Sequence, residues 1–154
     1  MRPIFDFAGN SALGVWMRDS QYRFPAVEIT HLLGLGLLLG SILILNARFF
    51  GLGMKRQRPS EVAADFASWT KLALIVMLIS GIPLFASKAP ELWEQDRLGF
   101  ELKMVLVIVA VVFHYTVQVP LARADNFSRG KLAAGFSLLV WFGAAVCGLT
   151  LEFL

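Results

Sequence analysis

Charged residues are scarce in this sequence of 154 residues, which also has a single cysteine and only two histidines. Charged side chains make up 16% of the chain and hydrophobic ones 57%, whereas soluble domains average roughly 25% and 45–50%. This balance excludes an ordinary soluble domain and indicates a membrane protein. The lone Cys147 excludes an internal disulfide, a CxxC metal motif and a covalent haem-attachment motif.

Other familiar motifs are missing as well. The sequence has no HExxH motif, no nucleophile elbow and no phosphate-binding loop, so nothing indicates hydrolase or nucleotide chemistry. The sequence pI of about 9.4 comes from basic residues between the apolar runs. They do not alternate with aromatic residues as in RNA- or DNA-binding modules, so no nucleic-acid partner is expected.

Residues 1–23 do not resemble a cleavable signal peptide. Asp6, Asn10 and Arg18 interrupt them before a continuous apolar core can form. Trp16 and Tyr22 are typical of side chains at the headgroup level of a bilayer. We therefore predict a short segment that lies in the membrane interface.

Four apolar runs are long enough to cross roughly 30 Å of hydrocarbon as helices. They cover residues 24–45, 67–86, 102–121 and 132–154, approximately. The connections are short, which predicts an all-α, up-down four-helix transmembrane bundle in one domain, 1–154. In such a bundle the first and third spans face each other diagonally. Pro83 is expected to kink or end the second helix.

Basic residues indicate how the bundle is oriented. The first loop has Arg48, Lys55, Arg56 and Arg58, and the third has Arg123, Arg129 and Lys131. In the second loop Lys88 and Arg97 are mixed with Glu91, Glu94 and Asp96. The positive-inside rule then places the first and third loops in the cytoplasm and both termini outside. For a bacterial protein this means the inner membrane, with periplasmic termini.

The two histidines, His31 and His114, fall inside the first and third spans. Ionisable residues within a membrane are rare and usually mark a functional site. The alternative is an interhelical hydrogen bond of about 0.6 kcal/mol for each ring. Two imidazoles on facing helices are typical of axial ligands to b-type haem, so both are candidate metal ligands. Their predicted depths differ by roughly 9 Å along the bundle, so separate ligands for each remain an alternative.

Further polar residues surround these histidines in the helical pattern. Glu28 and Gly34 lie roughly 60° either side of His31 on the first span. Glu28 is expected to orient His31, and Gly34 either leaves room for a flat ligand or packs against a helix. Lys103 and Arg23 are expected to pair with haem propionates. For Lys103, simple snorkelling to the interface is the alternative.

Other chemistry has weaker support. A copper or zinc site could use His31, Glu28, His114 and Met77, although no spacing enforces it. The Glu28-x-x-His31 spacing occurs in di-iron bundles, but the other spans lack the second motif. A cofactor-free accessory subunit or a small transporter is the alternative function. On the opposite face, Gly36 and Gly40 form a GLLLG pattern that predicts a homo-oligomer.

The run FPAVEITHLLGLGLLLGSILILNARFFGLG resembles the opening of a family of small, functionally undefined bacterial inner-membrane proteins with four spans. The matching positions are Phe24, Pro25, Glu28, His31, Arg48, Gly51 and Leu52, and FELKMVL with Lys103 is also similar. Asn46 and Ala47 stand where that pattern often has an acidic residue. The resemblance implies the architecture but no activity.

The two in-span histidines alone give a looser similarity to membrane b-type cytochromes. We therefore expect a haem b protein that carries electrons between a quinol-type donor or acceptor and an outside partner, as a component of a membrane oxidoreductase.

Overall fold

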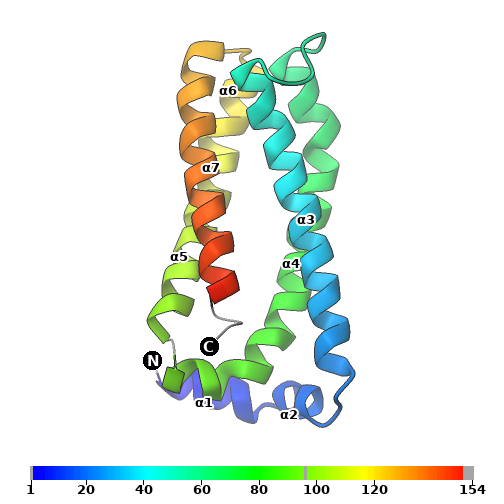
Figure 1. Ribbon diagram of the computed structural model, residues 1–154, viewed down its shortest axis with the longest axis vertical. Coiled ribbons are helices and arrows are strands. Elements are labelled where there is room, and N and C mark those ends of the chain that lie inside the picture. The colour runs from blue at the N-terminus through cyan, green and yellow to red at the C-terminus, as the bar shows by residue number, and fades with distance from the viewer. Residues whose placement is uncertain (1, 96, 151–154) are drawn as a thin grey trace.

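The computed structural model describes residues 2–95 and 97–150. Within these ranges all regular structure is helical and no strand is present (Figure 1). Four helices are long and apolar enough to cross a membrane, which confirms the predicted all-α four-span bundle. We call its two ends the α1 end and the α6 end, after the short helices that lie there (Figure 1).

The four long helices extend beyond the predicted spans. The first two are α3, Arg23–Phe50, and α4, Pro59–Gln95. The third consists of α5, Arg97–Phe113, a π-helical turn η1, His114–Gln118, and α6, Val119–Arg123. The fourth is α7, Phe127–Thr150. Residues 151–154 of the predicted fourth span lie outside the described residues.

The long helices pack as two pairs. Helix α3 packs along α4, and α5 packs along α7, while α3 also packs against α7. The first and third spans are therefore diagonal, as predicted. Helix α4 meets the third long helix mainly through α6. Figure 1 shows the two pairs close together near α6 and farther apart toward α1.

The buried apolar core lies in the half of the bundle nearer the α6 end. One cluster contains Leu38, Ile42, Ala73, Ala110, Val140 and Trp141. A second, closer to α6, contains Leu45, Phe49, Val62, Ala122 and Ala134. Both clusters use the C-terminal part of α3, so the packing that holds the two pairs together is concentrated there.

The predicted interfacial segment forms two short helices, α1 (Arg2–Asn10) and α2 (Ala12–Arg18). Phe5 is buried, and its ring centroid lies 5.3 to 5.9 Å from those of Phe85, Trp93 and Phe100. Met17 is buried as well, whereas five other large apolar side chains of the segment are exposed, namely Ile4, Phe7, Leu13, Val15 and Trp16. A segment anchored by two apolar residues, with exposed apolar side chains at the end of the spans, fits the membrane interface.

Two prolines lie inside α4 without ending it. Pro83 is expected to kink or end the second helix; the helix continues through Pro83 and Pro90 to Gln95, so Pro83 does not end it. Figure 1 shows its C-terminal part turning to run across the α1 end. Because proline has no N–H, Pro90 leaves the carbonyl of Ala86 without its helical donor.

Arg18 of α2 supplies the missing donor. Its guanidinium donates to the carbonyl oxygens of Ala86 at 3.3 Å and Ser87 at 3.1 Å. It also donates to the carbonyl of Gly9 at 2.5 Å. Gly14 permits this close approach, since a Cβ there would lie 2.8 Å from the Ala86 oxygen. A charged side chain thus ties the interfacial segment to the proline-containing part of α4.

A third proline coincides with the π-helical turn. The N–H of Val119 donates to the carbonyl of His114, five residues earlier, instead of four. Pro120 follows directly and cannot donate at all. A π turn absorbs one extra residue and turns the side chains that follow it. Here it contains two buried polar residues, His114 and Gln118.

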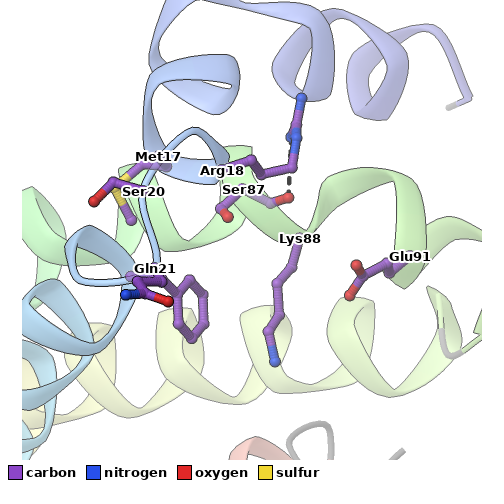
Figure 2. Close-up of a pocket in the computed structure, with 8 residues that line it drawn as sticks. Met17, Arg18, Ser20, Gln21, Ser87, Lys88 and Glu91 are labelled. Carbon is purple, nitrogen blue, oxygen red and sulfur yellow. Dashed lines mark hydrogen bonds between the residues drawn. The ribbon is translucent and has the colours of Figure 1, made fainter.

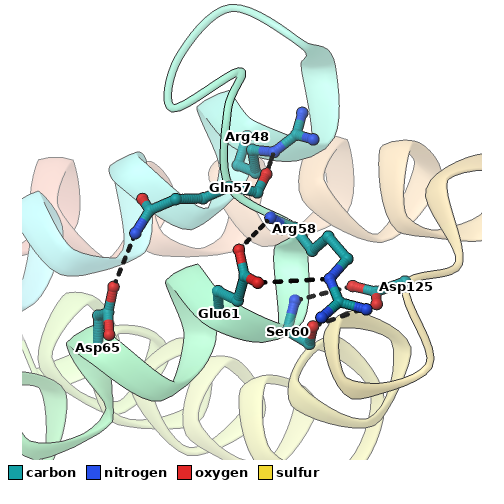
Figure 3. A network of polar contacts seen from close by, with 7 residues as sticks. All are labelled: Arg48, Gln57, Arg58, Ser60, Glu61, Asp65 and Asp125. Carbon is teal, nitrogen blue, oxygen red and sulfur yellow. Dashed lines mark hydrogen bonds and ion pairs between the residues drawn. The ribbon is translucent and has the colours of Figure 1, made fainter.

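Polar side chains connect the loops at the α6 end (Figure 3). Asp125, from the turn between α6 and α7, accepts from the backbone N–H of Ser60 at 2.9 Å and from its hydroxyl at 3.1 Å. It therefore satisfies two donors at the start of α4. Arg48 donates to the carbonyl of Gln57 at 2.5 Å, and Gln57 in turn donates to Asp65 at 3.0 Å.

Replacing Arg18 with methionine should lower the free energy of unfolding by about 1–2 kcal/mol, because backbone carbonyls lose a charged donor while the apolar contacts stay. Unfolding in detergent, followed by circular dichroism, measures the change. Arg2→Met is the matched control, since Arg2 makes an exposed ion pair with Asp6. Equal stability of the two variants would contradict the role given to Arg18.

Asp125→Asn should lower stability at neutral pH, and the difference from the wild type should shrink as the solution is acidified. The Ser60 backbone N–H, then its hydroxyl and the nearby Arg58 and Arg48, lower the pKa of Asp125. Because the pKa is lower in the folded state, the carboxylate stabilises the protein above the unfolded-state pKa of about 3.9. This stabilisation is lost as the pH falls through the folded-state pKa.

Thermal unfolding from pH 7 down to about pH 3 tests this expectation. Asparagine tolerates the positive φ of 49° at position 125, so the substitution changes the charge of the side chain without straining the backbone. Asp6→Asn serves as the control. A difference between wild type and Asp125→Asn that stays constant over the whole range would exclude a contribution from the carboxylate charge.

Candidate functional site

His31 is held in one orientation by a serine on the neighbouring helix. Its Nδ1 lies 2.8 Å from the hydroxyl oxygen of Ser80 on α4. That hydroxyl donates its only hydrogen to the carbonyl of Val76 at 2.6 Å, so it accepts from Nδ1–H of the histidine. In the neutral ring Nε2 then has the lone pair, which is the state needed to bind a metal or accept a proton.

The surroundings of His31 differ on its two sides. A Cβ at Gly81 would lie 3.3 Å from Cε1 of the ring, so this glycine lets α4 approach the imidazole. Gly34, by contrast, is buried, and a Cβ there would lie 2.9 Å from Cγ1 of Val76. The space predicted beside Gly34 for a flat ligand is therefore occupied by α4. Gly34 packs helices together instead.

Lys103 approaches from the opposite helix pair. Its side chain extends from α5 to the surface of α7 at Gly148. A Cβ at Gly148 would lie 3.0 Å from the Lys103 Nζ and 3.2 Å from its Cε. Its charge is close enough to act on the imidazole of His31. We call His31, Ser80, Gly81, Lys103 and Gly148 the His31–Lys103 site. Its residues come from both helix pairs, in the half of the bundle nearer the α1 end.

His114 belongs to a different, fully buried polar group. Its Nδ1 donates to Oε1 of Gln118, 2.9 Å away, and the hydroxyl of Ser137 donates to the same oxygen at 3.2 Å. The Gln118 amide donates to Oδ1 of Asn46, whose own amide lies 3.5 Å from the Ser137 oxygen. The four side chains are at most 6% exposed. We call them the Gln118 network. It links α3, η1 and α7.

The structure does not bring His31 and His114 together. Asn46 follows His31 by 15 residues on α3, a rise of about 22 Å. His114 lies about one turn, roughly 6 Å, from Gln118 toward the α1 end. The two imidazoles are therefore about 16 Å apart along the bundle, more than the offset of roughly 9 Å expected from the sequence. One haem between these two rings does not fit this arrangement.

The remaining predicted residues are dispersed. Arg23 donates to the carbonyl of Trp16 at 2.6 Å and lies 4.4 Å above its ring, so it ties α3 to the interfacial segment. Glu28 is half-buried, about one turn from His31 on α3. Met77 packs against the first core cluster. Within residues 2–95 and 97–150, no three His, Cys, Asp or Glu side chains gather as a metal site would require.

Gly36 and Gly40 face away from the bundle. A Cβ at either position would meet nothing within 4 Å, and Ile29, Leu33 and Leu43 on the same helix are exposed. This face of α3 is open to lipid or to a second chain. The homo-oligomer predicted from the GLLLG pattern stays a prediction.

Sequence reasoning missed several residues of both groups. Ser80, Gly81 and Gly148 were not singled out, and neither was Ser137. A weak signal did exist, because a polar residue inside an apolar span usually faces the interior. Asn46 was noted only as a departure from a family pattern, yet it is 1% exposed and central to the Gln118 network.

A comparison with known protein families matches residues 4–154 to a family of unknown function, DUF6644. The chain belongs to this family. No curated protein and no solved structure matches it. The family membership agrees with the expected resemblance to a functionally undefined family and brings no activity with it. The similarity to b-type cytochromes stays a prediction.

Gln118→Ala should destabilise the protein by about 1–2 kcal/mol, because it leaves His114, Asn46 and Ser137 without their shared partner in a dry interior. Unfolding by SDS titration, followed by circular dichroism, measures this. Thr116→Ala is the control, since the exposed hydroxyl of Thr116 donates within its own helix, to the carbonyl of Val112. A loss no larger than that of the control would mean that the network contributes little.

Proposed function

We propose that this membrane protein binds haem b and carries electrons, with His31 as an axial ligand. The observation that supports this is the fixed imidazole of His31. Ser80 accepts from its Nδ1–H, so Nε2 of the neutral ring has the lone pair that an iron ligand needs. Haem b, when bound, supplies reversible one-electron exchange at its iron.

The other residues of the His31–Lys103 site fit this proposal. Lys103, on the opposite helix pair, brings a positive charge that suits the propionates of haem. Gly81 and Gly148 let the His31 ring and the Lys103 side chain lie close against α4 and α7, which keeps both groups inside the bundle. The proposal therefore keeps His31 and Lys103 from the sequence-based hypothesis and assigns His114 to the Gln118 network.

A quinone is the small-molecule redox partner we favour. The indole N–H of Trp141 has no hydrogen-bond acceptor within the described part of the chain, although the residue is only 4% exposed. Trp141 lies one turn along α7 from Ser137, toward the His31–Lys103 site. Buried donors without a partner are rare, and a quinone carbonyl is an acceptor of the kind that this indole lacks.

The basic loops support an orientation in the membrane. The first and third loops carry seven basic residues between them and lie together at the α6 end, where Asp125 reaches Ser60. We propose that the α6 end faces the cytoplasm of a bacterial cell and that the α1 end and both termini face the periplasm.

The cofactor-free alternative is also supported by one observation. The Gln118 network is a closed set of hydrogen bonds, which is what a purely structural polar group would form. In that case the protein is an accessory subunit or a small transporter, and His31 stabilises packing through Ser80.

Absorption spectroscopy of protein purified from haem-supplied cells tests the proposal. We expect a Soret band and about one haem per chain. His31→Ala should reduce haem occupancy more than about tenfold, and Ser80→Ala should weaken haem binding by about tenfold through the lost support of His31. His114→Ala should keep the Soret band per folded chain but unfold more readily.

Three results would contradict the proposal. Colourless, folded wild-type protein would remove the haem and favour the cofactor-free alternative. An unchanged spectrum in folded His31→Ala would exclude His31 as a ligand. Loss of haem from folded His114→Ala would mean that the two histidines share one haem after all.

A further inference from the structure

A small pocket lies at the α1 end, away from both polar groups described above. Its volume is about 280 Å³. It is lined by Met17, Arg18, Ser20, Gln21, Phe24, Ser87, Lys88 and Glu91. Figure 2 shows these residues coming from α2, the turn after it, the start of α3 and the C-terminal part of α4. We call it the Lys88–Glu91 pocket.

The position of the pocket indicates which part of a bilayer it meets. It adjoins the interfacial segment, where Trp16 and Tyr22 are exposed. It also adjoins the C-terminal part of α4, which crosses the α1 end of the bundle (Figure 1). Exposed aromatic rings of this kind lie at headgroup level. The groups that this pocket meets in a bilayer are therefore phospholipid headgroups.

Three charged residues line the pocket, but one of them is already in use. The guanidinium of Arg18 donates to three backbone carbonyls and so forms part of the wall. Lys88 places its ammonium 5.1 Å from the centre of the Phe24 ring. Glu91 is exposed, and within residues 2–95 and 97–150 it makes no ion pair with Lys88. One positive and one negative charge thus remain for a ligand.

We propose that the Lys88–Glu91 pocket binds the headgroup of phosphatidylethanolamine. Its phosphate suits the ammonium of Lys88, and its primary ammonium can donate hydrogen bonds to the carboxylate of Glu91. The hydroxyl of Ser20 and the amide of Gln21 add donors for phosphate oxygens. Met17 and Phe24 provide an apolar wall beside them. This inference does not depend on haem binding.

The paired charges predict selectivity among common lipids. Phosphatidylglycerol has a phosphate but no cation, so Glu91 disfavours it. Phosphatidylcholine has a cation without N–H donors, so it cannot form charge-assisted hydrogen bonds to Glu91. Phosphatidylethanolamine alone among the three satisfies both residues.

Native mass spectrometry of the full-length protein in detergent, with equal amounts of short-chain phosphatidylethanolamine, phosphatidylglycerol and phosphatidylcholine, tests the proposal. The wild type should retain phosphatidylethanolamine roughly tenfold over the other two, the effect of one charge-assisted hydrogen bond. Glu91→Gln should lose that preference over phosphatidylcholine and take up more phosphatidylglycerol. Lys88→Gln should bind all three lipids less.

Glu94→Gln is the matched control, because Glu94 is exposed on the same part of α4 but does not line the pocket. It should behave as the wild type does. Equal binding of the three lipids by the wild type would overturn the proposal. So would an unchanged preference in both Lys88→Gln and Glu91→Gln, with circular dichroism confirming that these variants are folded.

Discussion

Hydrocarbon offers no hydrogen-bond partner, so a polar group inside this bundle is costly unless the chain itself satisfies it. The Gln118 network is the clearest result of that constraint. One amide accepts from His114 and Ser137 and donates to Asn46, and so joins three helices at a single buried point. The apolar clusters pack on both sides of the same region. The bundle is therefore closed most firmly in the half nearer α6.

The same constraint explains how the chain tolerates its prolines. A proline inside a helix removes a backbone donor, and at two of these prolines the chain compensates locally. Near Pro120 the helix widens into a π turn, whereas near Pro90 the guanidinium of Arg18 replaces the lost donor. Both compensations have further consequences. The π turn contains His114 and Gln118, and Arg18 fixes the interfacial segment beside the Lys88–Glu91 pocket.

The polar residues lie at two depths in the bundle. We assign a structural role to the Gln118 network and the proposed haem chemistry to the His31–Lys103 site. The Gln118 network uses His114 as a hydrogen-bonding side chain among residues that are almost completely buried. About 16 Å away along the bundle, Ser80 accepts from the Nδ1–H of His31, and Lys103 adds a positive charge to the same half of the bundle. Ionisable groups in such a setting can bind a charged or metal-containing partner, which is why the proposed chemistry is placed there.

The sequence by itself determined the class of fold and the four spans, because these follow from hydrophobic length and from the alternation of apolar runs with charged loops. It also indicated that His31, His114 and Lys103 face the interior. Only the tertiary structure decided which of them meet. Helix extension, the π turn and the divergence of the two helix pairs set the depth at which each side chain lies, and none of these follows from local composition. Ser80 became the partner of His31, Asn46 became the partner of Gln118, and Val76 filled the space beside Gly34. Packing brings together residues that the sequence keeps far apart.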